Sequence, residues 1–485
     1  MPFDPVILWT DALVYVLVIA VAGAALYVRR HEHLRQPWRR VAHSAPGMVG
    51  LVVLTFFVVF GLLDSLHFRA RLDDAGGGKA SYAVEVTSVL DAALRTLQER
   101  SEKTYSAPLA YRLYARETVE LPDGAQSRVY PRLRHGGAHL KAPEQEWAAD
   151  VSRRALAGAA GGFIAWVAAA MLICAGIARA RAQSIDQVWR ALARGGLDLP
   201  WRAILITLAC VLVLIGVAAA LAAKYHVLGT SKVGEDVLYQ ALKSIRTALV
   251  IGTLTTLVML PFAILLGIAA GYFKGLADDV IQYVYTTLNS IPAVLLIAAA
   301  VLMMQVYVDT HPQLFPSGAE RADLRLLFLC AILGVTSWTG LCRLLRGETL
   351  KIRELDYIQA AQAFGVSHLR IILRHILPNV MHIVLIAVVM EFSSLVLAEA
   401  VLSYVGVGVD PSMISYGTMI NAARLEMARD PMVWWSLAAA FAFMFALVLA
   451  ANLFADAVRD AFDPRVAIVK PFKLRLGRTL VGRTG

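Results

Sequence analysis

The sequence predicts an all-α polytopic membrane protein with about nine transmembrane helices and a small α+β extracytoplasmic domain. Hydrophobic residues make up 58% of the 485 residues, and the mean hydropathy is +0.61. Charged residues make up 17%, against roughly 25% in an average soluble domain. Apolar runs of about 20 residues, the length that a helix needs to cross a bilayer, recur along the whole chain.

The apolar runs predict nine membrane spans, which lie at 6–28, 47–66, 156–178, 202–222, 247–272, 280–305, 324–344, 379–404 and 433–457. Asp4 precedes the first run and Arg29 and Arg30 follow it, which reverses the charge order of a signal peptide. We therefore expect a retained span. The four cysteines lie in or beside apolar runs without a CxxC pair, which favours small packing residues over a metal site or disulfides.

Basic residues predict the orientation of the spans. They are concentrated in four segments, 29–40, 179–196, 343–374 and 459–485. With nine spans and an N-terminus outside, all four segments and the C-terminus lie in the cytoplasm, as the positive-inside rule requires. The short acidic loop 273–279 is the exception. This distribution accounts for the net charge of +10 without nucleic acid as a partner.

Residues 67–150 differ from the rest of the chain in being polar, with turn signals at DDAGGG and LPDG. Their length and polarity predict the extracytoplasmic domain. The rhythm of residues 84–100 indicates a helix, and YRLYARETVEL is compatible with a strand. His135 and His139 lie four residues apart in a basic, glycine-rich context without an acidic or cysteine partner, so we predict no metal site.

Motifs for nucleotide or hydrolytic chemistry do not occur in the sequence. It contains no GxxxxGK[ST] sequence, no nucleophile elbow and no HExxH. We expect a chain that is not an enzyme and holds no cofactor. If the protein uses ATP, another chain must bind it.

A basic, glycine-containing stretch, QAAQAFGVSHLRIILRHILPN at 359–379, lies between two predicted spans. Residues 357–372 suit an amphipathic helix, with a small face at Ala360, Ala361 and Gly365 that would let another protein approach closely. Gly365 costs roughly 1 kcal/mol inside a helix relative to alanine, or permits a turn between two short helices. The alternative is a helix on the lipid surface with its arginines at the headgroups.

This stretch resembles the EAA loop of ABC-importer permeases, since QAAxxxG is followed by HILP. More narrowly, it resembles the C-type permeases of the dipeptide, oligopeptide and nickel importers. Further motifs of that family follow in order: HVLGTSKVGEDVL, LLGIAAGYFKGLADDVI, NSIPAVLLI, LAEAVLSYVGVGVDP, SYGTMI and VRDAFDPR. The resemblance covers about 200–465, roughly half of the chain, and several ordered motifs make it specific.

The resemblance implies a type I permease core of six spans in a bacterial cytoplasmic (inner) membrane. Its expected partners are a second homologous permease, two ATP-binding subunits that hold ATP and Mg, a solute-binding protein and membrane lipid. Peptides are the favoured cargo, and nickel or another small solute is the second choice. In the family the loop is a coupling helix that docks in a groove of the ATPase. The residues that carry over are Gln359, Ala360, Ala361, Gly365, His375, Leu377 and Pro378.

Three positions depart from the family pattern. Gln359 replaces a glutamate, His375 an aliphatic residue, and Thr286 an acid. The implied division of the chain is 1–66 for two extra spans, 67–150 for the domain, 151–200 for a third extra span and a cytoplasmic linker, 201–465 for the permease core, and 466–485 for a basic cytoplasmic tail. We expect the added spans to pack at the periphery, so a chain that starts near Ala191 should still assemble.

Two other functions remain as alternatives: an ion- or proton-coupled secondary transporter, and a membrane sensor that uses the outer domain. The first needs ionisable groups within the membrane. Glu391 and Glu399 lie eight residues apart on nearly one face of the predicted span 379–404. Each is a candidate to line a pathway or to stabilise helix packing.

Overall fold

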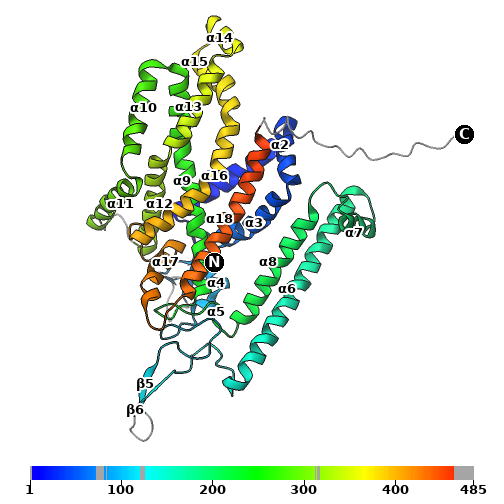
Figure 1. The fold of residues 1–485 in the computed structure, drawn as a ribbon, viewed down its shortest axis with the longest axis vertical. Helices are drawn as coiled ribbons and strands as arrows, with labels where there is room; N and C mark the ends of the chain where they lie inside the picture. Colours follow the sequence, from blue (N-terminus) through cyan, green and yellow to red (C-terminus); the bar gives the residue numbers. More distant parts are fainter. Residues whose placement is uncertain are drawn as a thin grey trace, which may run out of the picture.

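The computed structural model describes residues 3–72, 81–83, 85–120, 126–311, 313 and 317–463. Within these residues, nine helical segments are long and apolar enough to cross a membrane (Figure 1), which confirms the all-α polytopic fold. The tail 466–485 and the turn signals DDAGGG and LPDG lie outside the described residues. The membrane-crossing helices are α1 (Trp9–Arg30), α3 (Ala45–Asp64), α6 (Pro143–Arg181), α8 (Trp201–Ala222), α9 (Val237–Phe273), α11 (Ala293–Thr310), α12 and α13 (Gly318–Ser337 and Thr339–Arg353), α16 (Leu377–Val405) and α18 (Trp435–Phe462).

One predicted span is wrong as a single helix. Residues 280–305 are divided between α10 (Gly275–Ser290) and α11, and only α11 has the length and composition of a span. The break falls at Ile291, which has extended backbone angles (φ −90°, ψ 131°). Pro292 explains it, because proline disfavours helical angles at the preceding residue and has no N–H to donate.

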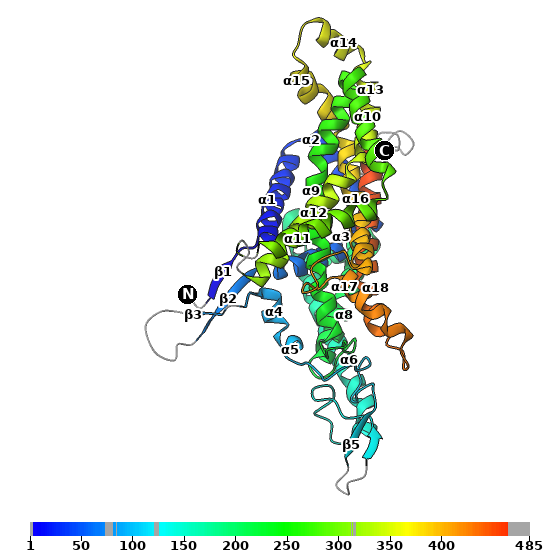
Figure 2. The same ribbon diagram turned by 90° about the vertical axis from the view of Figure 1, so that its left-hand side faces the viewer.

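The two ends of the bundle differ in their short elements (Figures 1 and 2). The end called here the loop end has α14 (Asp356–Ala363) and α15 (His368–Ile371) at its tip and α2 (Glu32–His43) below them. Helix α7 (Ile185–Arg194) connects α6 to α8 at the end of their hairpin that faces the same way (Figure 1). The opposite end, called the domain end, carries the N-terminus and the strands. At the loop end Trp38 of α2 contacts Phe462 of α18, with ring centroids 5.4 Å apart. The basic segments 29–40 and 179–196 and the predicted coupling loop therefore share one end.

The domain end contains two small antiparallel sheets and short helices. Strand β1 (Phe3–Val6) pairs with β2 (His67–Leu72), which also pairs with β3 (Ser81–Tyr82) and β4 (Thr87–Ser88). Strands β5 (Glu117–Glu120) and β6 (Gln126–Val129) form a hairpin. The helix expected at 84–100 is instead two short helices, α4 (Val89–Ala93) and α5 (Arg95–Gln98). The inserted domain is thus α+β as predicted, and its first sheet includes a strand from the N-terminus.

Helix α3 lies among the core helices, so the expectation of peripheral packing is wrong for it. It contacts α8, α9 and α18. Glycines permit this close approach: a Cβ on Gly50 would lie 2.5 Å from the carbonyl oxygen of Ala450, and one on Gly61 would lie 2.5 Å from Leu249. Phe57 of α3 is buried in the largest apolar cluster, together with residues of α9, α16 and α18.

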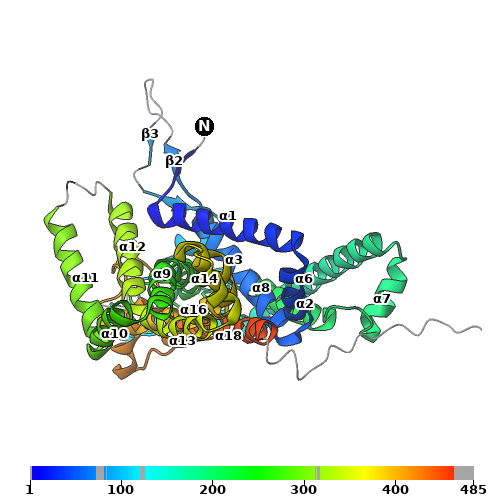
Figure 3. The same ribbon diagram turned by 90° about the horizontal axis from the view of Figure 1, so that it is seen from above.

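Helices α6 and α8 form an antiparallel hairpin beside this core (Figures 1 and 3). Their contact is also made by glycines, since a Cβ on Gly158 would lie 2.4 Å from the carbonyl oxygen of Gly216. At the loop end, Val188 and Leu192 of α7 are buried against the same hairpin. The first span of the predicted permease core, α8, thus has an added helix as its immediate neighbour.

Candidate functional site

The predicted coupling loop forms a helical hairpin at the tip of the loop end (Figure 2). The expected continuous helix 357–372 is wrong, and the alternative of a turn at Gly365 is confirmed. Helix α14 ends before Gly365, which adopts φ +73°, and α15 follows. This left-handed conformation is accessible to glycine at little cost. A π-helical turn, Ile372–Ile376, then leads into α16.

Three isoleucines fix the hairpin to the rest of the protein. Ile358, Ile371 and Ile376 are fully buried in a cluster that also holds Tyr272 and Leu345. The exposed surface of the hairpin includes Gln359, Ala360, Phe364 and Gly365, with Phe364 88% exposed. A single exposed apolar side chain is common on protein surfaces, so this surface gains meaning from the resemblance of the loop to a coupling helix.

The predicted contact residues do not all lie on this surface. Ala361 is half-buried and packs toward the isoleucine cluster, as does Leu377. His375 is half-buried, its ring 6.1 Å from that of Tyr357, and its carbonyl oxygen accepts a hydrogen bond from Asn379 at 2.6 Å. Pro378 lies in the first turn of α16, where a missing N–H is tolerated.

Polar contacts connect the hairpin to the end of α9. The Tyr272 hydroxyl hydrogen bonds with Nδ1 of His368 at 2.8 Å, and Nε2 of Gln362 donates to the same hydroxyl at 3.4 Å. Just beyond α9, Lys274 forms an ion pair of 2.6 Å with Glu354, which lies just before α14. A displacement of the hairpin would therefore act directly on α9.

The acidic loop 273–279 that departs from the charge rule is neutralised by a neighbouring helix. Asp278 accepts two hydrogen bonds from Arg346 of α13, at 2.6 and 2.7 Å. A bidentate arginine–carboxylate pair is strong and geometrically defined. Thr286, which departs from the expected family pattern, is exposed on α10.

Glu399 is buried, and one of its carboxylate oxygens accepts hydrogen bonds from two serines. It is 2% exposed and accepts hydrogen bonds from Ser403 at 2.6 Å and from Ser415 at 2.8 Å. Ser415 also caps α17 (Tyr416–Arg424), so Glu399 joins α16 to α17. Glu391 is half-buried and accepts from Ser394 at 2.9 Å. The contacts of Glu399 are those of a packing residue.

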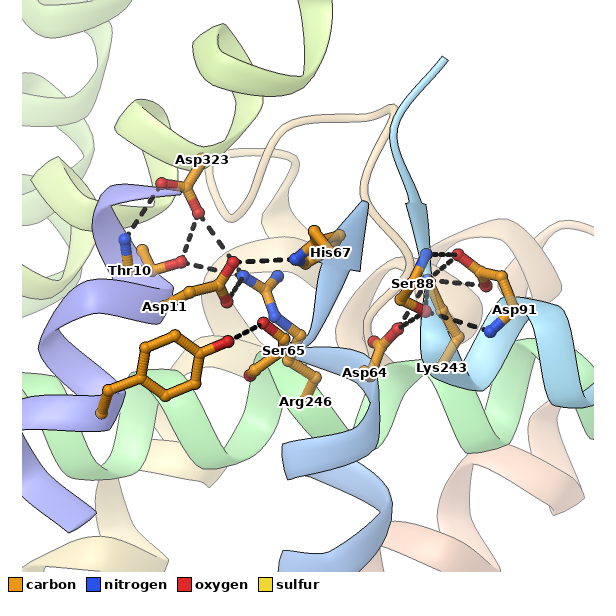
Figure 4. A network of polar contacts seen from close by, with 11 residues as sticks. Thr10, Asp11, Asp64, Ser65, His67, Ser88, Asp91, Lys243, Arg246 and Asp323 are labelled. Atoms are coloured by element: carbon orange, nitrogen blue, oxygen red, sulfur yellow. Dashed lines mark hydrogen bonds and ion pairs between the residues drawn. The ribbon is translucent and has the colours of Figure 1, made fainter. Parts of the chain in front are cut away.

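A buried polar network at the domain end was not predicted from the sequence (Figure 4). Arg246 of α9 donates to Asp11 of α1 at 2.6 Å and to Thr10 at 2.9 Å, and it lies 3.6 Å from Asp323 of α12. His67 of β2 approaches Asp11 at 2.8 Å. One turn earlier, Lys243 pairs with Asp64 of α3 at 2.6 Å and with Asp91 of α4 at 2.7 Å. The sequence feature that could have predicted this network is the pair of basic residues, Lys243 and Arg246, in the hydrophobic helix α9.

A second buried link joins the inserted domain to the segment 226–236. Glu102 accepts backbone hydrogen bonds from Arg134, His135 and Gly136 and lies 3.4 Å from His226. Burial alone would raise the pKa of Glu102, but His226 and these N–H groups lower it to about 2.

The same link changes the titration of the histidine. Burial alone would lower the pKa of His226, but Asp236, at 2.7 Å, and Glu102 raise it to about 9. His226 is therefore charged at neutral pH. His139, four residues from His135, contacts Asp150 at 2.7 Å. Among the described residues, no group of three or more His, Cys, Asp or Glu is placed to hold a metal ion.

Comparison with known proteins matches the second half of the chain. Residues 263–468 match the family described as binding-protein-dependent transport system inner membrane component. An oligopeptide transport system permease protein of Mycobacterium tuberculosis is 31% identical over 239 residues, 49% of this chain and 76% of the relative. A glutathione transport system permease protein of Pectobacterium atrosepticum is 32% identical, over 50% of this chain and 73% of its own. A dipeptide transport system permease protein of Bacillus subtilis is 26% identical, over 50% and 69%.

The chain belongs to this family of binding-protein-dependent permeases. It is a C-type permease subunit of an ABC importer, as the order of its motifs predicted. Permease subunits are not themselves enzymes, and the protein is a multi-pass membrane protein. The matched regions cover about half of the chain, which leaves the first three spans and the inserted domain as its distinguishing part.

Proposed function

We propose that this permease works with a second, homologous permease, two ATP-binding subunits and a solute-binding protein, and that ATP and Mg are held by the ATP-binding subunits. The observation that supports ATPase docking is the hairpin with exposed Phe364 and Gly365, attached to α9 through Tyr272. ATP binding elsewhere would move this hairpin and so bias the permease between two states.

In the proposed orientation the hairpin lies in the cytoplasm and the inserted domain outside. The loop end holds the arginine-rich α2 and α7, which the positive-inside rule assigns to the cytoplasm. A membrane-impermeant maleimide should label Val233→Cys in intact cells, but Gly196→Cys only after permeabilisation. Both need Cys210→Ser, which removes the exposed native cysteine. The reverse pattern would invert the proposed topology.

The cargo is a peptide or a similar small solute. The relatives are named for oligopeptide, glutathione and dipeptide transport, and all three cargoes contain peptide bonds. We also propose that the inserted domain stands beside the external mouth of the pathway, where a binding protein docks.

The test is uptake by proteoliposomes that contain this chain and its proposed partners. We expect accumulation of a labelled short peptide that needs both ATP on the cytoplasmic side and the binding protein on the other. A proton or sodium gradient should not replace ATP. Uptake driven by such a gradient without ATP would contradict the proposal and favour a secondary transporter.

A further inference from the structure

The domain end of α9 carries a stripe of residues that pair with charged or buried partners. Its members, Asp236 at the N-cap and then Tyr239, Lys243 and Arg246, are spaced by three, four and three residues. Residues at this spacing lie on one face of a helix. Asp236 pairs with His226, which faces Glu102 of the inserted domain. A hydrophobic helix with such a stripe needs polar partners along its length.

Those partners come from the added part of the chain. The Tyr239 hydroxyl donates to Asp91 at 2.8 Å, Lys243 pairs with Asp64 and Asp91, and Arg246 pairs with Asp11. Successive turns of α9 thus contact three added elements: first α4, then α4 and α3, then α1. The added segments therefore supply the hydrogen-bond and ion-pair partners of the polar residues on α9.

The last of these contacts reaches a second core helix. Asp323 of α12 accepts from the backbone N–H of Thr10 at 3.0 Å and from the Thr10 hydroxyl. Thr10 lies in the first turn of α1, where unpaired N–H groups and the helix dipole favour a carboxylate. The first turn of α1 therefore joins α12 to α9.

This junction is sealed from water. Thr10 and Asp11 have no exposed surface, Asp323 is 2% exposed and Arg246 is 6% exposed. To separate α9 from α12 here would leave buried charges without partners, which is far more costly than keeping the junction closed. At its other end α9 holds the hairpin through Tyr272, so one continuous helix runs between the two.

We propose that Thr10 and Asp11, with Arg246 and Asp323, form an external clamp that keeps the domain ends of α9 and α12 together throughout the transport cycle. The two helices and α1 then move as one unit when the hairpin is displaced. The role of the hairpin in this inference rests on the proposed function, whereas the clamp itself rests on the contacts of this chain alone.

The test measures the distance between spin labels at Val233→Cys, just before α9, and Gly318→Cys, at the start of α12. Val233 is 66% exposed, and a Cβ on Gly318 meets no atom within 4 Å, so both sites accept a label. With Cys210→Ser as background, we expect one narrow distance distribution. In the complex with ATP-binding subunits, that distribution should stay unchanged between the nucleotide-free and ATP-trapped states.

Two variants of different severity test the clamp residues. Asp11→Asn removes the charge that pairs with Arg246, and Thr10→Val removes one hydroxyl while keeping its volume. Each should broaden the distribution or shift it by several ångströms, whereas Asp4→Asn, an exposed carboxylate on β1, should not. Unchanged distributions in both variants, or an ATP-dependent change in the unmutated chain, would overturn the clamp. If the unmutated chain keeps one constant distance but shows no solute-stimulated ATPase activity, the proposed function of the hairpin is wrong, whereas the clamp stands.

Discussion

Arg246 of α9 and Asp11 of α1 form a 2.6 Å ion pair between two residues that are 235 positions apart in the chain. The first belongs to the permease half and the second to the added half, and both are buried. Since an unpaired buried charge is costly, each half of the chain depends on the other.

The pair predicts a non-additive loss of stability. Arg246→Met should lower the free energy of unfolding by roughly 3–5 kcal/mol, because Asp11 and Asp323 stay buried after losing the arginine that pairs with them. The double variant Asp11→Asn/Arg246→Met should lose less than the sum of the single variants. Denaturation in mixed micelles measures all three, with Asp4→Asn as control. Strict additivity would show that the pair does not stabilise the fold.

The close approach of α3 predicts a contrast between two glycines. Gly50→Ala should destabilise the protein by about 1–3 kcal/mol, because the new Cβ meets the backbone of α18. Gly23→Ala in α1 meets no atom within 4 Å and should be neutral or slightly stabilising. Thermal unfolding in detergent compares them. Equal behaviour of the two variants would mean that α3 is loosely packed.

The link between Glu102 and His226 predicts a dependence of stability on pH. A raised pKa of about 9 for His226 gives stabilisation that is complete below pH 6.5 and is lost as the pH rises to about 9. A lowered pKa of about 2 for Glu102 gives stabilisation that is complete above pH 4.5 and is lost as the pH falls to about 2.

This link should therefore contribute most between pH 4.5 and 6.5. We expect the unfolding temperature of the wild type to fall between pH 6.5 and 9 by more than that of His226→Gln, which lacks the titrating group. Parallel curves for the two proteins would show that this histidine does not hold the inserted domain in place.

The hairpin turn predicts a loss of coupling without a loss of folding. Gly365→Leu places a side chain at φ +73°, at a cost of roughly 1–2 kcal/mol, and should reposition α15. In the assembled importer, solute-stimulated ATPase activity should fall at least tenfold while the amount of purified chain is unchanged. Gly347→Leu, in open space on α13, is the matched control. Full stimulation in Gly365→Leu would remove this turn from the coupling path.

Several features of the fold could be predicted because they depend on local sequence. Apolar runs gave the span count, and the coupling loop was found from QAAxxxG and HILP. The turn at Gly365 was one of two alternatives, the other being a continuous helix over 357–372, because glycine permits both conformations. The break before Pro292 was missed although the sequence signals it, because the largely polar residues 286–290 and the proline itself interrupt the apolar run.

The position of α3 and the buried network could not be predicted, because both depend on contacts between residues far apart in the chain. Asp11 and Asp64 resembled charges at the ends of spans, and their partners on α9, Arg246 and Lys243, lie about 180 or more residues away. The expectation that a chain starting near Ala191 would assemble was made without knowledge of these long-range contacts. Such a chain would lack Asp11, Asp64 and Asp91, leaving Lys243 and Arg246 without these carboxylates.

The most direct test of the account is to find which protein touches the tip of the hairpin. A photo-crosslinking amino acid at Phe364, which is 88% exposed, should link this chain to an ATP-binding subunit in the native membrane. The same amino acid at Trp189, exposed on α7, and at Val129, exposed at the domain end, should not form this product. If Phe364 captures only lipid, or if the ATP-binding subunit is captured equally from Trp189 or Val129, the hairpin is not the coupling site.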